Sequence, residues 1–250
     1  TMNDELMLYT TWNLGIRGGG YNAPIIPLAF TGDDYTDEIM SYDPEKLYAY
    51  EVGFKATLFD GLARLNGAAY YYDYQDYQAF FIFGIQTFTV NTDAESKGAE
   101  LEFTTSPIEG LDILLGAAYN DIDVDLPTGG TSPSVVAPEW NLNAMIRYEW
   151  PMLGGYVALQ ADTVYVDNRV FALTGLEPSA ADSYTLSNVS VSYATEDRSW
   201  LLRAFVDNVT DEEYLVQTFD LSGLDNFGMT EQYYGRPQWW GVSLQYNFGG

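Results

Sequence analysis

The stretch WNLNAMIRYEW (residues 140–150) alternates apolar and polar side chains with a period of two, which is the period of a β-strand. Its even-numbered residues form an apolar stripe with a tryptophan at each end, and Arg147 and Glu149 lie on the other face. Ten residues of a strand tilted by about 45° span roughly 24 Å, close to the apolar band of a membrane β-barrel. The stretch therefore indicates a strand with lipid on one side and water on the other.

The same alternation recurs along the chain. It is clear in the ranges 47–58, 111–120, 200–207 and 238–248, and weaker in 5–16, 62–81, 86–105, 153–166 and 184–195. No segment shows a helical period with caps, and the longest apolar run, AFFIFGI (79–85), is too short for a transmembrane helix. We therefore predict an all-β protein of about ten antiparallel strands.

Short and long connections alternate between these strands. The short ones are 59–61, 106–110, 150–154 and 195–199, and the long ones are 17–46, 125–138, 167–183 and 208–235. Short turns at one rim and long loops at the other are typical of an outer-membrane barrel. A soluble β-sandwich is the alternative. Charged side chains at the centres of strands are costly in the core of a sandwich, but they are ordinary in the water-filled lumen of a membrane barrel. The charges expected in the lumen are Glu51, Lys55, Arg64, Glu100, Glu102, Asp112, Arg147, Glu149, Asp162, Arg203 and Asp207.

The composition excludes several function classes. The net charge of −26 repels nucleic acid, so we expect no nucleic-acid partner. The sequence has no Cys and no His, which excludes disulfides, thiolate or histidine metal sites and a Ser-His-Asp triad. An outer-membrane hydrolase on a ten-stranded barrel is a further hypothesis, but no acidic pair has a defensible catalytic spacing. We predict that the protein is not an enzyme.

Five stretches, in this order, resemble the C-terminal half of a TonB-dependent outer-membrane receptor. They are LMLYTTWNLGIRGGGYN (6–22), the hairpin that starts PEKLYAYEVGFKATLFDG (44–78), the hairpin that starts NTDAESKGAELEF (91–124), DNVTDEEY (207–214) and YYGRPQWWGVSLQYNF (233–248). The resemblance implies the last ten strands of a 22-stranded barrel in the outer membrane of a Gram-negative bacterium. It also implies uptake of a scarce ligand, such as a siderophore or an oligosaccharide, energised through the TonB complex.

The chain departs from that family in what it contains. It shows no plug domain, no TonB-contacting segment and no first twelve strands, so we expect residues 1–250 to be the C-terminal part of the barrel. Lipid does not tolerate open sheet edges, so the missing strands and plug must come from the same product or another chain. The alternatives are a self-closed ten-stranded barrel and a receptor-derived structural subunit of a larger outer-membrane complex that does not transport.

Aromatic residues provide candidates for ligand binding and for membrane anchoring. Those in the long connections face outside and are the expected ligand contacts: Tyr21, Phe30, Tyr35, Phe219, Phe227 and Tyr233. Those expected to form an interfacial girdle and to take part in assembly are Trp140, Trp150, Trp240, Tyr246 and Phe248. The stretch YYYDYQDYQAFF (70–81) is interpreted as part of this girdle, with a ligand-stacking platform as the alternative.

Acidic residues provide a weak metal candidate. Asp121, Asp123 and Asp125 have the spacing of the first ligands of a calcium loop, but the rest of that motif is absent. The alternative is a solvated acidic rim that divalent cations bridge to lipopolysaccharide, and no other cofactor is expected. Asp207, Asn208 and Asp211 are expected to pin the last long loop through side-chain bonds to the backbone.

Overall fold

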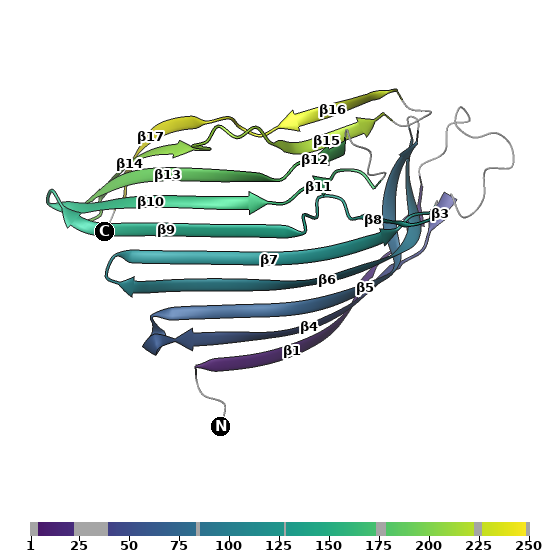
Figure 1. Ribbon diagram of the computed structural model, residues 1–250, viewed down its shortest axis with the longest axis horizontal. Coiled ribbons are helices and arrows are strands. Elements are labelled where there is room, and N and C mark those ends of the chain that lie inside the picture. Colours follow the sequence, from purple (N-terminus) through teal and green to yellow (C-terminus); the bar gives the residue numbers. More distant parts are fainter. Residues whose placement is uncertain are drawn as a thin grey trace.

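A computed structural model of the chain describes residues 5–22, 40–83, 86–127, 129–173, 179–222 and 227–248. One antiparallel sheet runs through it in the order β1-β4-β5-β6-β7-β9-β10-β13-β14-β17, and β8 pairs with β7 beside this path (Figure 1). The bounds are β1 Leu6–Arg17, β4 Glu45–Leu58, β5 Ala63–Phe83, β6 Gln86–Ile108, β7 Leu111–Asp125, β8 Thr131–Pro133, β9 Trp140–Met152, β10 Gly155–Val166, β13 Tyr184–Thr195, β14 Trp200–Asp207 and β17 Trp239–Tyr246. The predicted ten strands are confirmed, as is their antiparallel order.

The two ends of the sheet differ as predicted. At one end, here called the turn end, tight turns and the 3₁₀ turn Phe59–Gly61 join the strands. The opposite, loop end carries the long connections and the remaining short strands: β2 Gly20–Tyr21, β3 Ser41–Tyr42, β11 Arg169–Val170, β12 Ala180–Ala181, β15 Leu215–Leu221 and β16 Met229–Tyr234. Within the part of the chain that the structure describes, no helix is long and apolar enough to cross a membrane.

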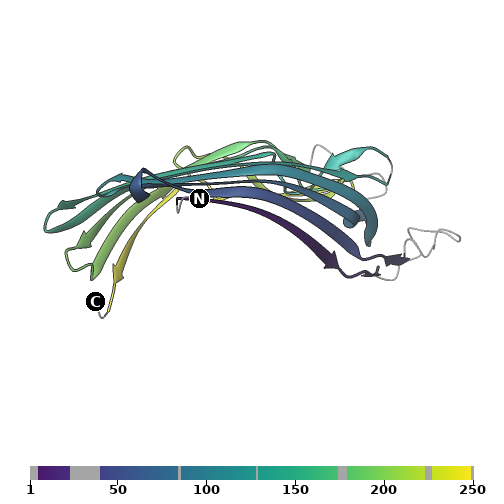
Figure 2. The same cartoon turned by 90° about the horizontal axis from the view of Figure 1, so that it is seen from below.

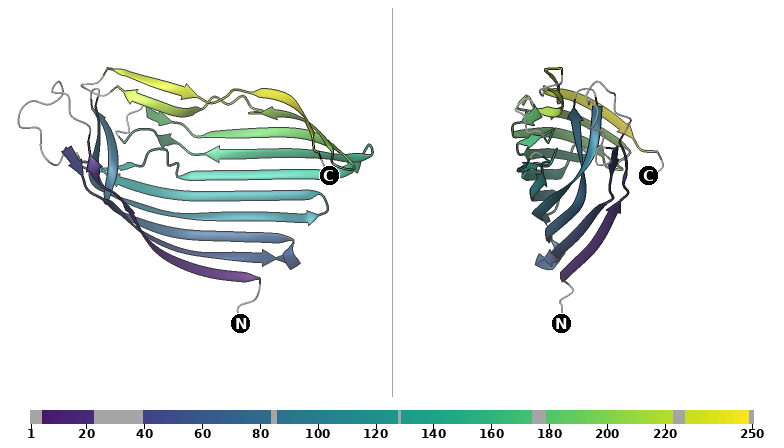
Figure 3. Two further views of the ribbon diagram at one scale, coloured as in Figure 1. Left: turned by 180° about the vertical axis from the view of Figure 1, so that it is seen from behind. Right: turned by 90° about the vertical axis from the view of Figure 1, so that its right-hand side faces the viewer.

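The sheet is curved like a trough and is open along two edges. Figure 2 shows the bend along the strands, and Figure 3 shows β1 and β17 at opposite edges. In the described strands β1 pairs only with β4, and β17 pairs only with β14. The alternative of a self-closed ten-stranded barrel is therefore not what this sheet forms.

Strand register places all the predicted apolar stripes on one side of the sheet. Trp12 lies opposite Tyr50 at one edge, and Val242 lies opposite Ala204 at the other. This apolar face is open: Trp12 is 61% exposed and Val242 is 65% exposed. Since a water-facing surface of this extent would be an aggregation site, the natural surroundings of the apolar face are lipid.

The opposite side, here called the polar face, carries the charges expected in a lumen. Because successive side chains alternate between faces, the register assigns them all to this side: Glu51, Lys55, Arg64, Glu100, Glu102, Asp112, Arg147, Glu149, Asp162, Arg203 and Asp207. The arrangement is therefore the reverse of a soluble sandwich, with water or polar groups on the inside.

Aromatic rings on the polar face lie over glycines of the neighbouring strand. Tyr9 is the register partner of Gly53, and Phe205 is the partner of Gly241. A Cβ built on Gly53 would lie 2.5 Å from the Tyr9 ring, and one on Gly241 would lie 2.7 Å from the Phe205 ring. Each ring thus fills the space that a side chain would occupy, which pins the strand register from the inside.

One cluster of buried apolar residues lies at the loop end of the sheet. There β5, β6 and β7 extend beyond their neighbours, and Leu173 from a long connection packs against them (Figure 1). The buried members are Ala79, Ala94, Val124 and Leu173, and Tyr74, Tyr77, Phe81, Val90 and Leu126 pack against them. This small core holds the loop end together where the strands leave the lipid.

Because adjacent leucines of β7 lie on different faces, the same substitution to arginine is expected to destabilise the protein by different amounts at the two positions. Leu115 lies on the apolar face, and Leu114 borders hollows on the polar face. We expect Leu115→Arg to cost about 2–4 kcal/mol of folding free energy in a bilayer, because it places a guanidinium in lipid, and Leu114→Arg to cost about 1 kcal/mol or less. Denaturant titration of the receptor in liposomes measures both. Equal losses in the two variants would contradict the assignment of the faces.

Candidate functional site

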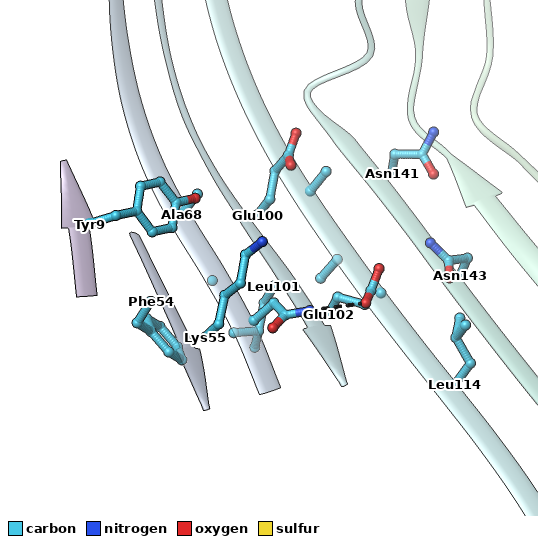
Figure 4. Close-up of a pocket in the computed structure, with 15 residues that line it drawn as sticks. Tyr9, Phe54, Lys55, Ala68, Glu100, Leu101, Glu102, Leu114, Asn141 and Asn143 are labelled. Atoms are coloured by element: carbon cyan, nitrogen blue, oxygen red, sulfur yellow. Dashed lines mark hydrogen bonds between the residues drawn. The ribbon is translucent and has the colours of Figure 1, made fainter. Parts of the chain in front are cut away.

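The polar face has a hollow of about 380 Å³ between β1 and β9, shown in Figure 4. Alternate residues of successive strands supply its polar lining: Tyr9, Lys55, Asn66, Glu100, Glu102, Asn141 and Asn143. Gly116 stands in register between Glu102 and Asn143, and the Asn143 side chain lies over it: a Cβ built on Gly116 would lie 2.5 Å from the Asn143 Nδ2. Asn66 donates a hydrogen bond of 3.3 Å to Glu102, and Lys55 is the one cation in this lining. The lining of this hollow therefore offers charged groups and hydrogen-bonding groups to whatever contacts it.

A second hollow of about 310 Å³ lies on the polar face near the turn end. Arg147, Arg198 and Arg203 line it together with Glu149. Glu149 accepts hydrogen bonds from both Arg147 and Arg198, the latter at 2.6 Å. Arg198 lies in the turn after β13, where its bond to Glu149 raises the pKa of its guanidinium further above the usual range. The sequence assigned Arg147, Glu149 and Arg203 to the lumen and Arg198 to a short turn, but it did not bring them together.

The tyrosines of 70–81 divide between the two faces. Tyr71 lies on the apolar face beside Tyr50, with ring centroids 6.5 Å apart, as a girdle residue should. Tyr70 and Tyr72 stack on the polar face at 4.7 Å, and Tyr74 continues their column. The girdle interpretation is therefore wrong for these three tyrosines, because consecutive residues of a strand point to opposite sides.

A β-bulge extends this column toward the loop end. The register of β5 on β6 shifts between Tyr74 and Tyr77, at Asp76, which has a φ of 58°. The extra residue restores Tyr77 to the polar face, where its ring meets Tyr74 edge-on at 5.6 Å. A bulge at Asp76 has no reliable sequence signal, since aspartate tolerates a positive φ without requiring it.

The aromatics expected to contact ligand occupy different places. Phe219 and Tyr233 share one exposed face of the β15–β16 hairpin, since Phe219 pairs with Glu231 and Tyr233 pairs with Gln217. Tyr233 donates a hydrogen bond to Glu231, which raises the pKa of its phenol. Phe227, 62% exposed, precedes β16, whereas Tyr21, 84% exposed, belongs to the β2–β3 pair near the other edge of the sheet. Phe30 and Tyr35 lie outside the described residues.

The acidic triplet at the end of β7 does not gather into a metal site. Asp121, Asp123 and Asp125 all point outward from the sheet, but a strand separates alternate residues by about 6.6 Å. Lys97 of β6 forms an ion pair of 2.9 Å with Asp121. Across the described ranges, no group of three or more acidic side chains is placed to hold a metal ion. The geometry fits the alternative interpretation, a solvated acidic rim above the apolar face.

The predicted girdle residues lie on the apolar face near the strand ends. At the loop end, Trp140 is the first residue of β9 and Trp240 is the second residue of β17, whereas Trp150, Tyr246 and Phe248 stand toward the turn end. Several pack in aromatic pairs: Trp140 with Tyr119 at 5.0 Å, Trp150 with Tyr148 at 5.5 Å, and Tyr246 with Phe248 at 4.6 Å. Two aromatic levels on an apolar face match the two interfaces of a bilayer, and a role in anchoring or assembly stays a prediction.

The last long connection is pinned where the sequence predicted. Asn208 is 4% exposed, and its side chain donates to the carbonyl of Glu212 at 2.8 Å and accepts from the Glu212 N–H at 2.8 Å. Asp211 accepts from the N–H of Gln238 at 2.8 Å, which ties the start of the connection to its end. The expected structural role of Asn208 and Asp211 is thus confirmed.

Comparison with known proteins agrees with this architecture. Residues 1–209 match the family model described as "TonB dependent receptor-like, beta-barrel". The chain belongs to this family. As a TonB-dependent receptor barrel it lies in the outer membrane of a Gram-negative bacterium, and its family is one of receptors and transporters.

Solved structures share the fold of this receptor barrel at low identity. The ferric yersiniabactin uptake receptor FyuA from Yersinia pestis has a TM-score of 0.80 and 17% identity, over 99% of this chain and 36% of that one. The ferric preacinetobactin receptor BauA from Acinetobacter baumannii has a TM-score of 0.70 and 19% identity, over 97% and 34%. The ferric-catecholate import receptor Fiu from K12 E. coli has a TM-score of 0.69 and 15% identity, over 98% and 33%. The chain thus spans about a third of the length of these receptors.

Truncation of Asn208 tests the anchor of the last connection. We expect Asn208→Ala to raise the free energy of the closed loop by about 1–3 kcal/mol, because buried backbone groups lose their partners. Protease added to intact cells should then cleave residues 208–235 at least about fivefold faster. Asn168→Ala is the matched control, since Asn168 is exposed and contributes a backbone N–H bond. Equal cleavage of wild type and Asn208→Ala would contradict the anchor.

Proposed function

We propose that residues 1–250 form the C-terminal part of the barrel of a receptor that takes up a scarce ligand with energy delivered through TonB. The observation that carries this proposal is the pairing of a lipid-type outer face with a hollowed, charged inner face on one open sheet. Such a wall encloses a polar lumen when it is closed, and a polar lumen is what a solute needs to cross lipid.

The free edges support the presence of further strands. β1 and β17 each leave one side of the described sheet unpaired, and unpaired backbone groups in lipid cost several kcal/mol each. The receptors that share this fold are about three times as long as this chain, which leaves room for twelve more strands and a plug. These parts come from the same product or from another chain.

The aromatic residues support a cargo with flat or ring-shaped groups. Phe219 and Tyr233 share an exposed face at the loop end, and the Tyr70–Tyr72–Tyr74 column runs along the inner wall. Aromatic rings stack on such side chains with useful free energy, as catecholate rings do. The three receptors compared above are named for ferric siderophores, which favours a siderophore over an oligosaccharide as the cargo.

Uptake by the complete receptor tests the proposal. We expect cells with the receptor to accumulate a radiolabelled ferric siderophore only when TonB is present. The double variant Phe219→Ala, Tyr233→Ala should bind that siderophore about tenfold more weakly, for a lost contact of about 1.4 kcal/mol. Phe59→Ala is the control, because Phe59 is 71% exposed but lies at the turn end.

Each failure of this test has a distinct meaning. Uptake of labelled oligosaccharides alone would replace the siderophore while keeping the transport function. Absence of any TonB-dependent uptake by a correctly inserted receptor would contradict transport and would favour the alternative, a structural subunit of a larger outer-membrane complex.

A further inference from the structure

The arginine-lined hollow at the turn end contains unbalanced positive charge. Its lining holds Arg147, Arg198 and Arg203 but one carboxylate, that of Glu149. Glu149 is already shared by Arg147 and Arg198, and within the described ranges no carboxylate lies within ion-pair distance of Arg203. In a chain of net charge −26, a hollow with more positive than negative groups is a local reversal.

Strand register explains why Arg203 forms no ion pair with Glu149, the one carboxylate in the lining of the hollow. Glu149 pairs with Ala158, Ala158 with Ser192, and Ser192 with Arg203, so one row crosses the sheet from β9 to β14. Three strand spacings separate Glu149 from Arg203, or about 14 Å of backbone. The two residues between them are small, which leaves an open floor between the charged ends.

Neighbouring acidic groups are engaged elsewhere. Asp162 accepts hydrogen bonds from Gln160 at 3.1 Å and from Asn188 at 2.7 Å. Asp197 in the turn accepts from Thr195 and Ser199, and these bonds lower the pKa of its carboxyl. Arg203 instead lies over the ring of Phe205, with its Cζ 5.3 Å from the ring centroid. The carboxylate that completes the hollow must therefore come from outside the row.

We propose that this hollow binds an acidic side chain of the polypeptide that fills the barrel lumen and is absent from this chain. The inference rests on the proposed function. Covering the polar face buries Arg203, and a buried unpaired guanidinium is strongly unfavourable, so the covering segment must supply a counter-charge. The hollow's 310 Å³ and its floor of Ala158 and Ser192 admit an aspartate or glutamate between Arg203 and the Glu149 pair.

The position of the hollow favours a lumen-filling segment over cargo as the occupant. The hollow lies near the turn end, and the exposed aromatics Phe219 and Tyr233 lie at the loop end. The other hollow has an excess of negative charge, since Glu100 and Glu102 share its lining with Lys55. A surface that covers both hollows therefore needs an acidic group at one and a basic group at the other. An acidic group seated among the arginines would fix the position of that surface in the lumen.

Photocrosslinking in the complete receptor tests the occupant directly. Leu201 lines the hollow and is replaced by p-benzoylphenylalanine, and crosslinked peptides are identified by mass spectrometry. We expect a crosslink to a lumen-filling segment within a few residues of an Asp or Glu. Crosslinks to cargo, or to no peptide of that segment, would overturn the proposal and leave the hollow to a small anion.

Charge reversal provides a second, functional test. We expect Arg203→Glu to loosen the lumen-filling segment and to raise the entry of a large antibiotic by about tenfold, with Arg203→Lys near wild type. Second-site suppressors of Arg203→Glu should convert an acidic residue of that segment to Lys or Arg. Arg236→Glu is the control, because Arg236 also lies over an aromatic ring, Trp239 at 4.5 Å, but outside the hollow.

Insertion is measured for every variant, and Arg203→Gln replaces Arg203→Glu if the latter fails to insert. Equal antibiotic entry for wild type and the inserted Arg203 variant would overturn the proposal. A wild-type receptor that transports but shows no crosslink from residue 201 to its lumen-filling segment refutes this inference alone. A wild-type receptor without TonB-dependent uptake refutes the proposed function instead.

Discussion

The fold depends on the absence of water from the interior of a bilayer. A strand in lipid must pair all its backbone groups with neighbouring strands, and it must show lipid only apolar side chains. The period-two alternation meets the second demand along every long strand, as the exposed stripe from Trp12 to Val242 shows. Backbone pairing on both sides is present in the strands from β4 to β14, whereas β1 and β17 each have one unpaired edge in the described sheet. The open edges make the sheet a wall that needs the rest of a barrel.

The inner face follows from the same alternation but obeys different physics. Every second residue points to a polar interior, where charges are tolerated and small residues create space. Ala68, Gly116 and Ala118 lie in the lining of one hollow, and Ala158 and Ser192 lie in the lining of the other. The lining of the first hollow has more carboxylates than cations, and the lining of the second has more guanidinium groups than carboxylates. The charge of the inner face therefore differs from one hollow to the other. Such a surface selects the orientation of whatever covers it.

Much of the architecture was predictable from local patterns, whereas the sites were not. Ten strands, their two faces, the turn and loop ends and the anchor at Asn208 all follow from residue order over short distances. The tyrosines of 70–81 were assigned to the girdle from their position along the strand, but the alternation of side chains places Tyr70, Tyr72 and Tyr74 on the inner face. The aspartates of β7 had suggestive spacing, but a strand holds them apart and Lys97 engages one of them.

The sequence by itself determined which residues of the regularly alternating strands face lipid and which face the lumen, but not the bulge at Asp76 that changes the facing of the residues after it in β5. It could do so because side chains alternate along any extended strand, whatever its neighbours are. Only the tertiary structure decided which lumen residues meet, because strand register joins positions far apart in the chain. Arg198 reaches Glu149 across 49 residues of sequence. In the part of the chain that the structure describes, Arg203 has no carboxylate within ion-pair distance, and the two small residues Ala158 and Ser192 stand between it and Glu149. Whether a charged side chain of the lumen finds an ion-pair partner is therefore decided by the assembled sheet.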